Sequence, residues 1–244
     1  MWRIELLGAL RAVGRERTIN RFSAGKGRSL LARLAFYLDR EHPREELIEL
    51  LWPECEPSAG RLRLRVAVSS LRRQLEPPGV PSGAAIIAES DSLRLNPHTI
   101  ETDVREFEAA LGSVPGQTPE QRTERLSHAV ELHAAELLPG LYDDWVLVER
   151  DRLSDLRLRA LEELIRLETE SGRLDFALDY ARRAVSTAPE REELQQHLIR
   201  LLVLLGRKRE AKSQLRTLTR LLREQLGVEP RPGTLRLLDL EPLP

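Results

Sequence analysis

The chain of 244 residues is long enough for two domains of ordinary size, each with its own buried core. Charged residues make up 32% and aromatic residues 4%, which is typical of helices rich in leucine, alanine, arginine and glutamate. The single cysteine, Cys55, excludes an internal disulfide and favours a cytoplasmic protein. No apolar run approaches the roughly 18 residues of a membrane span, and the first residues form a strand pattern, so we expect neither a membrane protein nor a secretory signal.

The first 97 residues predict strands, three helices and a terminal hairpin, in that order. Residues 3–22 alternate apolar and polar side chains, which indicates a short antiparallel meander. A helix is expected after Ser23-Ala24-Gly25, a second before Pro53, and a third from Ser58, as its N-cap, to Leu75. Two short strands, 84–89 and 92–95, flank the polar pair Ser90-Asp91. We therefore expect a winged helix-turn-helix domain over residues 1–97.

Residues 98–244 predict an all-α domain of tetratricopeptide-like repeats. Two segments are related by an offset of 34 residues: 164–167 and 198–201 have the same sequence, Leu-Ile-Arg-Leu. Gly172-Arg173 recurs at the same offset, as do Ala177 and Arg182. This period is that of helical hairpins with a tight glycine turn. A further helix is expected over 120–137, and a short closing helix over 235–240.

The third predicted helix has one apolar face and one basic face. At about 100° per residue, one side collects apolar and small side chains, namely Gly60, Leu64, Ala67, Val68, Leu71 and Leu75. The other side carries Arg63, Arg65, Ser69, Ser70 and Arg73 together with Leu62 and Val66, and Arg61 and Arg72 lie on the flank. Arginine can bind guanine through two hydrogen bonds, and serine can contact bases or phosphates. The pattern indicates a recognition helix, although it is also that of an ordinary solvated helix.

Charge and three further basic residues add to this DNA-binding hypothesis. Residues 1–97 hold 16 Lys and Arg against 12 Asp and Glu, whereas residues 98–244 hold 22 against 27. Arg94, in the predicted wing, is a candidate for contact with phosphate or the minor groove. Lys26 and Arg28 stand at the start of the first long helix, where backbone N–H groups attract phosphate. For each of these residues, simple solvent exposure is the alternative interpretation.

The sequence contains no pattern of catalytic or metal-binding residues. The five histidines are scattered without an HExxH spacing, and no second cysteine accompanies Cys55. The segment Gly25-Lys26-Gly27-Arg28-Ser29 lacks the spacing of a phosphate-binding loop. We therefore expect no enzymatic activity, no metal and no cofactor.

Several motifs resemble the SARP family of antibiotic regulatory proteins. Residues 26–76 look like its OmpR-type winged helix, with Leu30-Leu31-Ala32, Leu47-Ile48-Glu49-Leu50-Leu51-Trp52-Pro53 and Val68-Ser69-Ser70-Leu71-Arg72-Arg73-Gln74-Leu75. Segments 103–107, 144–153, 206–211 and 226–230 are similar to the bacterial transcriptional activation domain. The resemblance covers nearly the whole chain. It differs in the wing, where the family's Gly-Tyr is replaced by the stretch 90–95.

The resemblance implies a cytoplasmic transcriptional activator. Such a protein binds direct repeats in double-stranded DNA near promoters and recruits RNA polymerase, and the matching recognition segment is 61–75. The helical repeats would contact polymerase or mediate self-association into a homodimer, because stacked hairpins expose a concave surface. The alternative is a protein-interaction adaptor whose winged helix has lost DNA reading, which the altered wing and the acidic Glu54 and Glu56 favour.

Overall fold

The computed structural model describes residues 1–22 and 26–240, which form two compact units. The first unit comprises Met1–Gly112 with Glu131–Leu153, and the second comprises Ser113–Val130 with the described residues from Ser154 onward. These two units are not separated by a single boundary after residue 97, because each contains two segments of the chain. The domains 1–97 and 98–244 therefore stay a prediction. The three residues Ser23-Ala24-Gly25, expected just before the first helix, lie outside the described residues.

A four-stranded sheet begins the first unit. Strands β1 (Trp2–Glu5), β2 (Arg11–Gly14) and β3 (Thr18–Ile19) pair antiparallel, which confirms the predicted meander. Strand β7 (Ile100–Thr102) was not predicted and pairs in parallel with β1, so the order is β3-β2-β1-β7. Three residues are too few to show the alternation of apolar and polar side chains that predicts a strand. The strand β7 is therefore recognised only by its pairing with β1.

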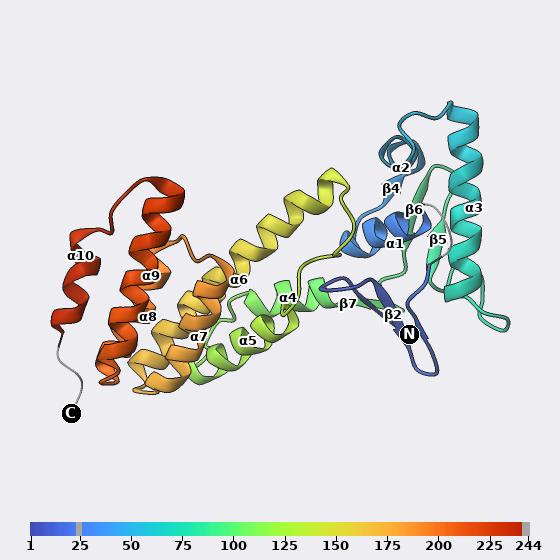
Figure 1. Ribbon diagram of the computed structural model, residues 1–244. Coiled ribbons are helices and arrows are strands. Elements are labelled where there is room, and N and C mark those ends of the chain that lie inside the picture. Colours follow the sequence, from blue (N-terminus) through green and yellow to red (C-terminus); the bar gives the residue numbers. More distant parts are fainter. Residues whose placement is uncertain (23–25, 241–244) are drawn as a thin grey trace. The chain divides into compact units, whose positions relative to one another are not determined.

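Three helices and a second sheet form the winged helix-turn-helix. Helices α1 (Gly27–Phe36), α2 (Arg44–Leu51) and α3 (Pro57–Leu75) precede the hairpin β5 (Ile86–Ala88) and β6 (Ser92–Leu95). Strand β4 (His42–Pro43) adds to β6, and α3 lies beside the hairpin (Figure 1). The predicted N-cap of α3 is wrong. Glu56 holds that position, because Pro57, with its fixed φ angle, suits the first helical residue.

The helix-turn-helix depends on a close approach between α2 and α3 at Gly60. This glycine is buried, and a Cβ atom on it would lie 2.3 Å from Cγ2 of Ile48 in α2. Two non-bonded carbon atoms do not come so close in proteins, and the β-branched Ile48 has few rotamers with which to move away. The absence of a side chain at Gly60 therefore sets how α3 packs on α2.

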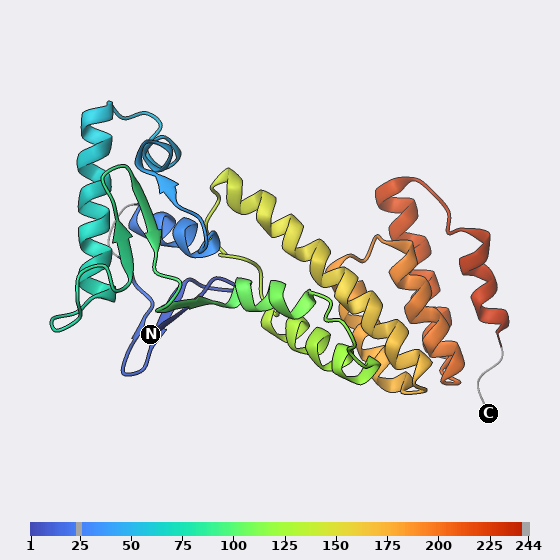
Figure 2. The same ribbon diagram turned by 180° about the vertical axis from the view of Figure 1, so that it is seen from behind.

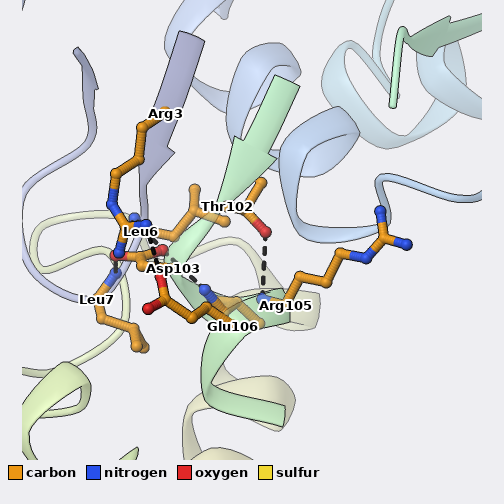
Figure 3. Close-up of polar contacts among 8 residues, drawn as sticks. Arg3, Leu6, Leu7, Thr102, Asp103, Arg105 and Glu106 are labelled. Carbon is orange, nitrogen blue, oxygen red and sulfur yellow. Dashed lines mark hydrogen bonds and ion pairs between the residues drawn. The ribbon is translucent and has the colours of Figure 1, made fainter. Parts of the chain in front are cut away.

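A buried carboxylate joins β1 to helix α4 (Asp103–Leu111), as Figure 3 shows. Asp103 is 4% exposed and accepts backbone N–H groups from Leu6 at 2.8 Å, Leu7 at 2.9 Å and Val104 at 2.9 Å. Burial raises the pKa of the Asp103 carboxyl, and the hydrogen bonds from Leu6 and Leu7 oppose that rise. Nearby, Arg3 pairs with Glu106 at 2.5 Å. These contacts fix the end of β1 to the start of α4.

The remaining helices are α5 (Pro119–Leu132), α6 (Asp144–Glu170), α7 (Leu174–Thr187), α8 (Glu192–Leu204), α9 (Lys208–Leu226) and α10 (Pro232–Leu235), followed by a 3-10 turn over Arg236–Asp239. In the second unit, α7, α8 and α9 lie side by side in both views (Figures 1 and 2). With the winged helix before it, this bundle confirms the predicted fold class.

The 34-residue repeat is visible in the turns. Gly172 and Gly206 both have positive φ angles, of 73° and 72°, which glycine adopts without strain. The residue after each glycine donates its N–H five residues back, from Arg173 to Glu168 at 2.9 Å and from Arg207 to Leu202 at 2.7 Å. The alanines at equivalent positions, Ala177 and Ala211, are both fully buried. The predicted repeat therefore corresponds to two helical hairpins with the same turn.

Gly60→Ala tests the close approach of α2 and α3. The added methyl group must displace Ile48, and we expect the free energy of unfolding to fall by about 1–3 kcal/mol. Gly27→Ala is the matched control, because its Cβ would meet nothing within 4 Å and alanine favours a helix. Urea unfolding of the two variants measures the difference. Equal stability of both would contradict the packing argument.

His42 predicts a pH dependence of stability. It is fully buried in β4, and this burial, with the nearby charge of Arg33, lowers its pKa from 6.5 to about 4. The unfolded chain therefore gains a proton below about pH 6.5 that the folded chain does not accept until about pH 4. The contribution of His42 to the free energy of unfolding is complete above about pH 6.5 and is lost as the pH falls from there to about pH 4.

His42→Leu isolates this contribution. We expect the wild type to lose up to about 3 kcal/mol more than the variant between pH 7 and pH 4, since one pKa unit corresponds to about 1.4 kcal/mol. Urea unfolding across this range gives both curves. Parallel curves for the two proteins would show that His42 does not cause the dependence.

Candidate nucleic-acid interface

Helix α3 buries the face that its sequence predicts. Leu64, Leu71 and Leu75 are 1% exposed or less, Gly60 and Val68 are also buried, and Ala67 is half-buried. On the opposite side, Leu62 is 57% exposed and Val66 61%. The candidate DNA-binding residues of α3 follow the same division, with Arg61, Arg63, Arg65, Ser69 and Arg73 exposed and Ser70 and Arg72 half-buried.

Three arginines of α3 are available for an external partner. Arg63, Arg65 and Arg73 form no side-chain hydrogen bond or ion pair with the described part of the chain. Their charges are therefore not neutralised within that part of the protein. Guanidinium groups in this state can donate paired hydrogen bonds to a phosphate or a guanine edge.

Arg72 instead connects α3 to the wing. Its guanidinium donates to the Ile86 carbonyl at 3.1 Å and lies 3.7 Å from the Glu76 carboxylate. Glu76 in turn accepts backbone N–H groups from Gly83 at 3.1 Å and from Ala85 and Ile86 at 2.9 Å. Arg72 and Glu76 thus hold the end of α3 against the strand β5.

The other predicted basic residues have partners within the first unit. Arg61 pairs with Glu45 and Arg94 pairs with Glu41, each at 3.3 Å. Lys26 lies 3.4 Å from the Asp143 carboxylate, and Arg28 donates to the Pro139 carbonyl at 3.2 Å. Lys26, Arg28 and Arg94 are therefore engaged within the first unit, unlike the unpaired arginines of α3.

A hollow of about 440 Å³ lies between α3 and the hairpin. Its lining residues are Arg44, Arg65, Val68, Ser69, Arg72, Arg73, Glu76, Val80, Ser82 and Ala88. The acidic residue in this lining, Glu76, has a side chain only 4% exposed and already engaged. The hollow therefore presents a positive surface with serine hydroxyls, which suits an anionic backbone.

Arg44 belongs to this surface and was missed by the sequence reasoning. Its guanidinium donates to the Glu89 carbonyl at 3.1 and 2.9 Å, so the start of α2 contacts the tip of the wing. The available signal was a basic residue in the first turn of a helix, where the macrodipole favours acids. The contact with the Glu89 carbonyl gives a structural reason for an arginine at that position.

The described residues hold neither a metal-binding cluster nor a membrane-spanning helix. No three His, Cys, Asp or Glu side chains of residues 1–22 and 26–240 gather in a group that could hold a metal ion. Over the same ranges, no helix has the length and apolar character needed to cross a membrane.

Comparison with known proteins places most of the chain in a family. Residues 102–239 match the model of the bacterial transcriptional activator domain. The chain is 28% identical to the regulatory protein AfsR of Streptomyces coelicolor over 218 residues and 32% identical to AfsR of Streptomyces griseus over 211. Each alignment covers 84% of this chain but 21% of the relative, so the chain spans about a fifth of the AfsR length.

A solved structure extends the likeness to the whole fold. EmbR of Mycobacterium tuberculosis, determined with a low-affinity phosphopeptide, is 25% identical and superimposes with a TM-score of 0.78. The match covers 100% of this chain and 66% of that one. With its winged helix and helical repeats, the chain belongs to the bacterial transcriptional activator domain family and is similar to regulators of the SARP type.

Proposed function

We propose that this protein regulates transcription by binding double-stranded DNA through α3 and the hairpin β5–β6. The observation that carries the proposal is the set of unpaired arginines on α3, Arg63, Arg65 and Arg73, two of which line the hollow beside the wing. In winged helices, a helix of this kind enters the major groove while neighbouring elements contact the backbone. Ser69 and Arg44 would contribute phosphate contacts at the edges of the same hollow.

The apolar side chains on the exposed face fit the same role. Leu62 and Val66 lie one turn apart, directly after Arg61 and Arg65 in the sequence, and both are well exposed. Thymine methyl groups are the apolar feature of the major groove, and aliphatic side chains can contact them. Base reading by arginine and methyl contact by these residues would together specify a sequence.

The family membership supports an activator that works through a second partner. In this proposal α3 binds direct repeats near a promoter, as a homodimer, and the helical repeats recruit RNA polymerase. The relatives that match are regulatory proteins by name, which agrees with this assignment. Because the chain covers about a fifth of those proteins, their complete activity does not transfer to it.

A protein-interaction adaptor is the second candidate. The observation in its favour is that the wing's Arg94 is paired with Glu41, while Lys26 and Arg28 contact the segment 139–143. Acidic Glu54 and Glu56 are exposed just before α3. In this candidate the winged helix no longer reads DNA, so we expect no preference for any duplex.

Selection of bound duplexes from a random pool, followed by binding at several salt concentrations, separates the two candidates. For a DNA-binding regulator, log affinity falls with log salt by about 0.9 for every phosphate neutralised. We expect a recovered consensus sequence and a steep slope. A pool that shows no enrichment, with no duplex bound at low salt, would leave the adaptor as the function.

Arg65→Ala and Arg73→Ala then test the recognition face. Each is expected to weaken binding to the selected duplex by about 1–3 kcal/mol and to relax preference at one base position. Arg159→Ala is the control, since Arg159 is an exposed arginine of α6 in the second unit. If both α3 variants keep the wild-type preference at every position, these arginines do not read bases.

A further inference from the structure

Helix α9 carries a continuous row of positive charge in the second unit. Arg209, Lys212, Arg216, Arg220 and Arg223 are all exposed and follow one another at intervals of three or four residues. Residues with this spacing share one face of a helix, and the row extends about 21 Å at 1.5 Å per residue. We call these five residues the basic row.

Most of the basic row has no partner within the described part of the chain. Arg223 pairs with Glu229 at 2.5 Å, whereas the side chains of Arg209, Lys212, Arg216 and Arg220 form no hydrogen bond or ion pair there. The acidic residue nearest its start, Glu210, is already engaged by Arg182 at 3.3 Å and Arg207 at 2.7 Å. Like charges in successive helical turns repel one another, which costs stability.

The repeat itself does not require this row. At an offset of 34 residues, the equivalent positions hold Asp175, Leu178, Arg182, Ser186 and Pro189. Only Arg216 therefore has a basic counterpart, and Lys212 stands where Leu178 is buried. A helix that closes a stack of hairpins needs a polar outer face, which neutral or mixed charges supply equally well. The positive charge is thus a property of these five positions and not of the architecture, and α9 also carries two acidic residues, Glu210 and Glu224.

An apolar hollow adjoins the row. A cavity of about 520 Å³ is lined by Leu215, Arg216, Thr219, Arg220, Arg223, Glu224 and Leu235. Leu235 comes from α10, which lies next to α9 (Figure 1), and its side chain is 49% exposed. The aliphatic stems of the arginines add to the apolar wall, while their guanidinium groups remain at the rim.

We propose that α9 and α10 form a docking surface for an acidic amphipathic segment of a protein partner. Carboxylates of that segment would pair with Arg209, Lys212, Arg216 and Arg220, and an apolar side chain would enter the hollow against Leu235. The hollow decides between partners, because a nucleic-acid backbone offers phosphates to the arginines but no apolar group to the leucine. All residues involved belong to the second unit, so the surface does not depend on DNA binding by α3.

The experiment measures binding of the full chain to a fluorescent helical peptide that carries glutamates and leucines at i, i+4 spacing. Arg216→Glu combined with Arg220→Glu is expected to weaken binding at least tenfold. The matched control is Arg159→Glu combined with Arg200→Glu, which makes the same charge change at exposed arginines of α6 and α8 and should stay within twofold. Circular dichroism of each variant verifies the helical fold.

Leu235→Ser tests the apolar part of the surface. We expect it to weaken the peptide about fivefold while leaving binding of polyglutamate unchanged. The proposal is overturned if the peptide does not bind, if polyglutamate binds as tightly as the peptide, or if the Arg216 and Arg220 changes weaken only duplex DNA. If peptide binding holds while no duplex is bound, the proposed DNA function fails and this docking surface stands.

Discussion

The placement of helix α3 depends on one strand that is fixed at both ends. At the far end of β1, the buried Asp103 carboxylate accepts the N–H groups of Leu6 and Leu7. At its start, the indole of Trp2 donates to the Leu75 carbonyl, the last residue of α3, at 2.9 Å. Unpaired N–H groups at Leu6 and Leu7 would each cost about 1–3 kcal/mol, so the strand cannot slip along its neighbours without losing these bonds. The direction of α3 is therefore tied to a residue 28 positions beyond its own end, counted from Leu75 to Asp103.

Arginine serves two purposes in the first unit, and the distance to an acid decides which. Arg72 lies beside Glu76 and contacts the Ile86 carbonyl, so it braces the wing against α3. Arg65 and Arg73 occupy the same helix, but they form no ion pair with the described residues, which leaves their charge for a partner. Their hydrogen-bonding groups are solvated in the free protein, and binding requires that this water be replaced by phosphate or base oxygens. Because Arg72 holds α3 against the hairpin, it also fixes the distance of Arg65 and Arg73 from the hairpin.

Periodic features of the fold could be predicted from the sequence, and contacts between distant residues could not. The buried face of α3 follows from spacing alone, as do the glycine turns at Gly172 and Gly206, since each is determined by neighbours within one helical turn. Strand β7 and the acceptor Asp103 depend on β1, almost a hundred residues earlier, and no local pattern records that pairing. The same limit applies to the candidate site. Arg65 could be assigned to an exposed face from its spacing in the helix. The contact of Lys26 with Asp143 could not be predicted, because the two residues are 117 positions apart in the sequence.

A net charge of −1 conceals two positive surfaces, on α3 and on α9, whose surroundings differ. Phosphate and carboxylate groups attract arginine at long range in the same way, and salt screens both. Discrimination therefore has to come from what surrounds each charge. On α3, the arginines stand beside serine hydroxyls and a wing, which suits a grooved and uniformly charged duplex. On α9, they surround Leu215 and Leu235, and a ligand gains affinity there only if it buries apolar surface at the same time. Exposed apolar side chains also accompany the arginines of α3, at Leu62 and Val66, so the feature that would favour a protein segment on α9 is the hollow into which an apolar side chain can enter.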